Sequence, residues 1–183
     1  ELLVKKSVIN DADALFSEQG YTLSTKLAKG LTYKATFWAQ NQNCTAYAVS
    51  DDMKVTVDYN GINNDESRDA FYATSDVFSV NSPSIVTVTL KRPFAQVNVG
   101  ANEWDVEYAK EAGMEVKTSS ATVKAVPNCI NLFDGSLEGA VDVVYTASAK
   151  PEEYLTVDVD RNGEDEVYDW MSMSYIPAPQ DGG

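Results

Sequence analysis

Apolar and polar residues alternate along many short segments of this chain, and this period of two constrains the fold more than any other feature. Successive side chains of a β-strand point to opposite faces of a sheet, so the alternation indicates strands with one buried face. Clear runs lie at residues 53–59, 141–145 and 155–159, with a shorter run at 78–80. Glycine, asparagine, aspartate and proline separate the runs, a pattern typical of a β-sandwich or barrel. The chain is therefore predicted to be all-β.

A β-hairpin is predicted near the start of the chain. Tyr21, Leu23 and Leu27 alternate with polar neighbours, and the same alternation continues over residues 31–39. A Lys29-Gly30 turn separates the two runs, and a glycine between two alternating segments is a hairpin signal.

One short helix is predicted from Asn102 to Ala112. Its asparagine is a good N-cap, Trp104 and Tyr108 are four residues apart, and Gly113 follows as a helix terminator. The segment from Asp11 to Gln19 is a weaker second candidate for a helix.

The alternation changes parity in the middle of the chain. From Val86 to Leu90 the apolar residues are even-numbered, and from Ala95 to Val99 they are odd-numbered. A slip of one residue turns every later side chain to the other face of a sheet. Pro93 lies at the slip, so a bulge or a crossing between two sheets is predicted there, with Leu90 and Val97 both buried. Two basic residues are expected to extend into solvent at this point, namely Lys91 and Arg92.

Composition excludes several classes of function. The chain has 28 acidic and 14 basic residues and a net charge of −14, which would repel nucleic acid and anionic membrane surfaces. Histidine is absent, which excludes Ser-His-Asp and Cys-His catalysis. Acidic residues are so frequent that pairs of them carry no information about glycosidase chemistry. The chain is therefore predicted not to be an enzyme, with no catalytic, cofactor-binding or metal-binding residues and no cofactor.

One segment imitates a calcium-binding loop. The sequence DVDRNG at residues 158–163, followed by Asp169, fits most of the EF-hand spacing. The flanking segments alternate like strands instead of helices, and Asp165 stands where an EF-hand has an apolar residue. Asn162-Gly163 is also a strong turn signal. We therefore predict a turn between two strands, without a bound cation.

Three tryptophans suggest an alternative function. Trp38, Trp104 and Trp170, together with the ten tyrosines, could supply an aromatic platform that stacks on sugars, so a carbohydrate-binding surface module is the second hypothesis. Aromatic residues of a β-sandwich more often belong to the core or to cross-strand pairs. The two cysteines, Cys44 and Cys129, are more simply interpreted as separate thiols than as a disulfide, although spacing alone leaves both open.

The chain is interpreted as one domain over residues 1–179, with residues 180–183 as a boundary or linker tail. The segment from Asn60 to Asp69 is rich in turn-forming and charged residues and is predicted to be a solvated loop. No apolar run is long enough to span a membrane, so direct membrane insertion by this chain is not expected.

Five segments, taken in order, resemble the fimbrillin-like proteins of the Bacteroidetes, which include pilus subunits and related adhesins. They are LTYKATFWAQ at residues 31–40, LKRPFAQVNVG at 90–100, the helix that begins near Asn102, VPNCINLFDG at 126–135, and MSYIPAP at 173–179. The resemblance covers nearly the whole chain.

This resemblance implies a transthyretin-like Greek-key β-sandwich that forms the amino-terminal domain of a longer lipoprotein precursor. It also implies a location at the cell surface, in the outer membrane or in a fimbrium. The implied partners are other pilins, surface proteins or host and bacterial receptors, with glycan as a further possibility. Function is expected to consist of protein–protein contact and strand exchange.

Overall fold

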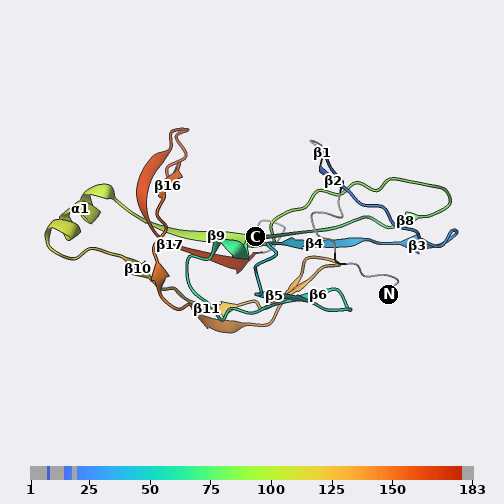
Figure 1. Ribbon diagram of the computed structural model, residues 1–183, viewed down its shortest axis with the longest axis horizontal. Coiled ribbons are helices and arrows are strands. Elements are labelled where there is room, and N and C mark those ends of the chain that lie inside the picture. Colours follow the sequence, from blue (N-terminus) through green and yellow to red (C-terminus); the bar gives the residue numbers. More distant parts are fainter. Residues whose placement is uncertain (1–7, 9–14, 18–19, 179–183) are drawn as a thin grey trace.

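The computed structural model describes Val8, residues 15–17 and residues 20–178. The described part is mostly β-structure with one α-helix, and Figure 1 shows an elongated molecule. The strands are β1 (Leu15–Ser17), β2 (Gly20–Thr22), β3 (Thr32–Tyr33), β4 (Thr36–Gln40), β5 (Tyr47–Val49), β6 (Lys54–Val57), β7 (Ala70–Thr74), β8 (Phe78–Ser79), β9 (Phe94–Ala101), β10 (Thr118–Ser119), β11 (Thr122–Val126), β12 (Cys129–Asn131), β13 (Leu137–Glu138), β14 (Val141–Val144), β15 (Ser148–Ala149), β16 (Tyr154–Val157) and β17 (Glu166–Pro177). The helices are α1 (Glu103–Glu111) and the 3-10 helix η2 (Glu66–Arg68).

The strands form several small antiparallel sheets, and among the described residues none closes into a barrel. The largest sheet has the order β13-β12-β6-β5, and a second has the order β16-β17-β9. Five two-stranded sheets complete the set: β1-β2, β3-β8, β4-β7, β10-β15 and β11-β14. The prediction of an all-β chain is confirmed at this level.

One hydrophobic core joins strands of different sheets. In β6, Val55 and Val57 are buried and the intervening Thr56 is exposed, as the alternation predicts. Val55 lies opposite Ile130 of β12, and both are fully buried. The same cluster includes side chains from β5, β7, β9, β14 and β17, among them Tyr47, Ala70, Phe94, Val143 and Met173. Burial of this apolar surface is the main force that holds the small sheets together.

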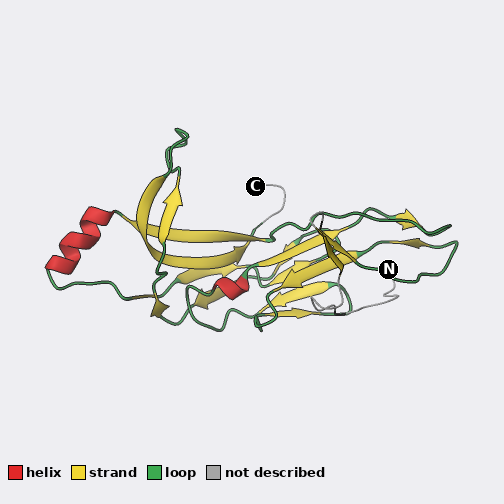
Figure 2. Cartoon of the chain, turned by 45° about the horizontal axis from the view of Figure 1, so that its top comes forward, coloured by secondary structure: helices red, strands yellow, loops and turns green. Residues whose placement is uncertain are grey.

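The predicted helix is present as α1. The side chain of Asn102 accepts a hydrogen bond from the backbone N–H of Trp104 at 3.0 Å, which is the expected N-cap. Gly113 follows the helix with a φ of +76°, a conformation that glycine adopts without a steric penalty. Figure 2 shows that α1 projects from one end of the molecule, and none of its residues is buried. The second helix candidate is wrong where it is described, because residues 15–17 form β1; the rest of Asp11–Gln19 lies outside the described residues.

The predicted hairpin near the start of the chain is wrong. β2 pairs with β1, β3 pairs with β8, and β4 pairs with β7. The Lys29-Gly30 turn does form, and Gly30 has a φ of +85°. Alternation specifies which face of a strand is buried but not which strand lies beside it, so distant partners replaced the neighbouring one.

The prediction for the parity slip is partly right. Lys91 forms a bridge with Tyr72 of β7, whereas Phe94 already pairs with β17, so the chain crosses from one sheet to another at buried Pro93. Residues 86–90 are not a strand, however. Leu90 is 39% exposed and Val97 is 45% exposed, so the prediction that both are buried is wrong.

Candidate functional site

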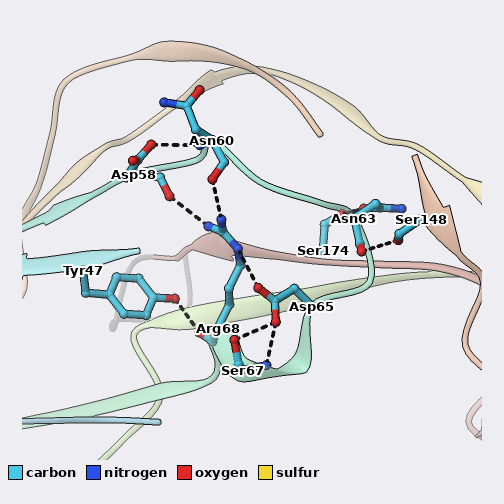
Figure 3. A network of polar contacts seen from close by, with 9 residues as sticks. All are labelled: Tyr47, Asp58, Asn60, Asn63, Asp65, Ser67, Arg68, Ser148 and Ser174. Carbon is cyan, nitrogen blue, oxygen red and sulfur yellow. Dashed lines mark hydrogen bonds and ion pairs between the residues drawn. The ribbon is translucent and has the colours of Figure 1, made fainter. Parts of the chain in front are cut away.

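The segment from Asn60 to Asp69 is a polar hub instead of a solvated loop, which corrects the sequence prediction. Arg68 at its end is 5% exposed, and its guanidinium donates to two backbone carbonyls (Figure 3). Nη1 bonds the carbonyl of Asp58 at 2.9 Å, and Nη2 bonds that of Asn60 at 3.2 Å. The guanidinium carbon also lies 5.5 Å from the ring centroid of Tyr145. Arg68 thus closes the loop back onto the strand that precedes it.

Two neighbours hold Arg68 in place. Asp65 caps η2 by accepting from the N–H of Ser67 at 3.0 Å, and its Oδ2 lies 3.5 Å from Nε of Arg68. The hydroxyl of Tyr47 donates to the backbone carbonyl of Arg68. Desolvation raises the pKa of Tyr47 well above its ordinary value, so this hydroxyl stays protonated as a donor.

Asn63 and Asn64 connect the hub to three strands. The Asn63 amide donates to Ser172 of β17 at 2.8 Å, and its Oδ1 accepts from Ser174 at 3.0 Å. The Asn64 amide donates to the carbonyl of Ala149 in β15 at 2.8 Å, and both amides donate to Ser119 of β10. Because the polar groups satisfy one another, this cluster ties sheets together.

A surface pocket of about 200 Å³ lies beside the hub. Its walls include the carboxylates of Asp58 and Asp65 together with the Arg68 guanidinium. Two carboxylates and one guanidinium leave these walls with a net charge of about −1, which disfavours an anion without assigning a ligand to the pocket. Its geometry assigns no reaction to the hub, whose main effect is to fix the relative positions of neighbouring strands.

The calcium-like segment forms the predicted turn between strands. β16 and β17 pair directly, with Tyr154 opposite Asp169 and Val157 opposite Glu166. Three carboxylates of the turn lie within 4.8 Å of one another, those of Asp158, Asp160 and Glu166. Asp169, which the EF-hand spacing would require as a ligand, instead forms an ion pair with Lys150.

The acidic turn uses these carboxylates as hydrogen-bond acceptors. Asp158 accepts from the N–H groups of Asn162 at 3.0 Å and Gly163 at 2.8 Å, and Glu166 accepts from the N–H of Val159 at 2.9 Å. These bonds give the backbone N–H groups of the turn their hydrogen-bond acceptors. The carboxylates therefore cluster because the turn needs them as acceptors.

The three tryptophans do not share a surface. Trp38 is half-buried and packs edge-on against Tyr47, with ring centroids 5.2 Å apart. Trp170 is 8% exposed and belongs to the core, whereas Trp104 is 69% exposed on α1. A platform made from all three is therefore not formed.

The edge of β9 is a feature that the sequence prediction missed. All eight residues of β9 pair with β17, apart from one register shift between Trp170 and Ser172, and no other described strand pairs with β9. Val97 and Val99 remain 45% and 52% exposed. The chain carries no charge from Phe94 to Asn102, whereas exposed edges in soluble proteins usually carry charges or proline. The absence of charged residues from Phe94 to Asn102 is the sequence feature that could have drawn attention to β9.

Arg92 and the cysteines have structural roles. Arg92 at the crossing is exposed, as predicted, and forms a bidentate ion pair with Asp69, whose oxygens lie 2.9 Å away. Its guanidinium also stacks over Phe71 at 5.0 Å. Cys44 and Cys129 are free thiols, so the interpretation as two separate cysteines is confirmed.

None of the helices in the described ranges has the length and apolar character needed to cross a lipid bilayer.

The comparisons with known proteins give a family without an assigned activity. The sequence profile of a family of unknown function (DUF6562) matches residues 3–181. No curated protein and no solved structure shows significant similarity to the chain. Because the profile spans nearly the full length, the chain belongs to this family of unknown function, DUF6562.

Proposed function

We propose that this chain is a non-enzymatic structural or adhesive protein of a bacterial cell surface, similar to a pilus subunit, that acts by protein–protein contact. The observation that carries the proposal is the edge of β9. Within residues 15–17 and 20–178, this eight-residue strand pairs with β17 alone, so its other edge offers a row of backbone N–H and C=O groups to a strand from another chain.

The surface of β9 suits such a partner. Added backbone hydrogen bonds would extend the β16-β17-β9 sheet, and apolar side chains of the incoming strand would cover Val97 and Val99. The net charge of −14 disfavours nonspecific aggregation, whereas no charged side chain of β9 itself opposes an incoming strand at this edge. Strand exchange at β9 is the mechanism that follows.

The sequence resemblance to fimbrillin-like proteins supports the same proposal. On that basis we infer a transthyretin-like Greek-key arrangement of the sheets and a location in the outer membrane or in a fimbrium. The partners would be other pilins, surface proteins or receptors.

Hydrogen exchange tests the proposal. The chain is mixed with a synthetic peptide that copies the last strand of its full-length precursor, and amide protection along β9 is measured. The expected result is added protection confined to β9, and its loss in a Val97→Lys variant, because lysine opposes an apolar strand at that position. Unchanged exchange at β9 with a saturating peptide would contradict strand exchange.

Carbohydrate binding is the second candidate, supported by the exposure of Trp104. A glycan array with the purified chain separates the two. Binding at micromolar concentration that a Trp104→Ala variant loses would favour the second candidate, and an array without signal would leave the first.

A further inference from the structure

The two ends of the elongated molecule carry opposite charge and exposed apolar side chains. Figures 1 and 2 place α1 at one end and the β3-β8 pair at the other. We define the aromatic tip as residues 102–116, and the basic tip as the turn at residues 26–31 with the facing segment at residues 80–86.

The aromatic tip is acidic, and its largest apolar side chains are exposed to solvent. Trp104 is 69% exposed, Tyr108 is 68% exposed and Met114 is 65% exposed. Acidic residues outnumber lysines in this tip by five to one. A nine-residue helix is marginal in water unless its apolar side packs against something, and α1 has no buried residue. The helix would therefore gain stability from a partner that covers its aromatic side chains.

The basic tip has the complementary properties. Residues 20–50 contain no acidic residue, in a chain of net charge −14, and both Lys26 and Lys29 are exposed. Leu31 is 56% exposed and Ile85 is 93% exposed. Hydrogen bonds between residues 30–31 and Val80, at 2.8 and 3.0 Å, hold the two segments of this tip together.

We propose that the aromatic tip of one copy docks on the basic tip of the next copy. The contact would place Trp104 and Tyr108 against Leu31 and Ile85, with the acidic residues of α1 facing Lys26 and Lys29. Aromatic side chains are frequent anchors of protein interfaces, and complementary charges fix their orientation. Since the two surfaces differ, the contact is heterologous and leaves a free tip at each end, so copies add in series.

This inference rests on the proposed structural role, and it names a second copy as the partner. It uses neither face nor edge of β9, so the two proposals can fail separately.

Sedimentation equilibrium of the 183-residue chain tests the contact. In about 0.15 M salt, where the Debye length is about 8 Å and the long-range repulsion between two copies of net charge −14 is largely screened, association should increase with protein concentration. In about 1 M salt, where the Debye length is about 3 Å, the attraction between the charged tips is screened as well, and association should weaken at least about tenfold. A chain that stays monomeric at millimolar concentration in about 0.15 M salt would overturn the proposal.

Two variants give a sharper test. Trp104→Ser with Tyr108→Ser blocks the aromatic tip, and Lys26→Glu with Lys29→Glu blocks the basic tip. All four positions are exposed, so both variants should keep the far-ultraviolet circular dichroism of the parent chain. Each variant alone should be monomeric.

A mixture of the two variants should form a one-to-one dimer and nothing larger, because each retains the tip that the other lacks. A mixture that remains monomeric would overturn the proposal. So would a Val97→Lys chain that loses association while both tip variants keep it, since the contact would then lie at β9.

Discussion

Arg68 shows at the scale of one residue how a charged side chain determines local structure. Its guanidinium is buried, and two backbone carbonyls and the nearby carboxylate of Asp65 compensate it. Gly61 allows the approach, because a Cβ at that position would lie 2.6 Å from Nη2. Without Arg68 the carbonyls of Asp58 and Asn60 would lose these two donors.

Replacing Arg68 with methionine should therefore lower the free energy of unfolding by about 3 kcal/mol, since it removes two charge-assisted hydrogen bonds and the ion pair with Asp65. Arg92→Met is the matched control. It removes an exposed ion pair with Asp69 and should cost about 1 kcal/mol or less. Urea unfolding monitored by tryptophan fluorescence measures both. Equal losses in the two variants would contradict the role assigned to Arg68.

Buried tyrosines predict the response to alkaline pH. Desolvation by burial raises the pKa of Tyr47, Tyr59 and Tyr145 in the folded chain. In the unfolded chain they titrate near about 10. Their neutral forms are therefore favoured by folding, and this stabilisation is complete below about pH 10 and is lost as the pH rises above it.

The urea midpoint should be constant from about pH 8 to 9.5 and should fall steeply above about pH 10. Tyrosinate absorbance near 295 nm should appear together with unfolding for the buried fraction of the tyrosines. Complete ionisation of all ten tyrosines without unfolding would contradict this prediction.

At the scale of elements, β9 pairs along its whole length with β17 and yet leaves the side chains of Val97 and Val99 exposed to solvent. Its pairing with β17 positions buried Phe94 at the start of the strand, yet Val97 is 45% exposed. A strand can therefore contribute a buried side chain to the core and still present other apolar side chains to solvent.

Val97→Asp should cost about 1 kcal/mol or less, because the carboxylate stays in contact with water at this position. Val143→Asp in β14 is the control, since Val143 is 3% exposed and an unpaired buried charge costs several kcal/mol or prevents folding. Chemical denaturation compares the two. A cost at Val97 as large as that at Val143 would show that β9 is covered.

The β16–β17 turn should not respond to calcium. Its carboxylates already accept backbone hydrogen bonds, and Asp169 is held by Lys150. A ligand at 100 times its dissociation constant would stabilise the fold by about 2.7 kcal/mol, which a melting curve resolves. The melting temperature at millimolar calcium should stay within about one degree of the value in chelator. A rise of several degrees that Asp160→Asn abolishes would show a metal site.

At the scale of the whole molecule, one core connects several small sheets. Side chains from β5, β6, β9, β12, β14 and β17 form a single hydrophobic cluster, and the polar hub adds hydrogen bonds between strands of different sheets. The sheets whose strands contribute to this cluster cannot be separated without exposing apolar surface, so these sheets should not unfold independently.

The chain should therefore unfold in one cooperative transition. Tryptophan fluorescence, which reports on Trp38 and Trp170 in the packed region, and far-ultraviolet circular dichroism should give coincident melting curves. The calorimetric and van't Hoff enthalpies should agree. Two separated transitions would show that the sheets form independent units.

The sequence by itself determined those features that depend on neighbouring residues. Alternation identified β6, β14 and β16 because a period of two is a local property of the strand. The Asn102 cap and Gly113 identified α1, and Asn162-Gly163 identified the turn between β16 and β17. The crossing at Pro93 could also be predicted, since a change of parity beside a proline depends only on neighbouring residues.

Only the tertiary structure decided which strands lie side by side and which polar residues are buried. β4 pairs with β7, with partners 30 to 38 residues apart in the sequence. Arg68 is buried by contacts with the Asp58 carbonyl, just after β6, and with the ring of Tyr145, which its sequence neighbours do not specify. Val97 has the local pattern of a buried residue and remains 45% exposed, because its face of β9 is not fully covered by the rest of the fold. Burial and pairing depend on what lies across space, and a period of two in the sequence carries no information about that.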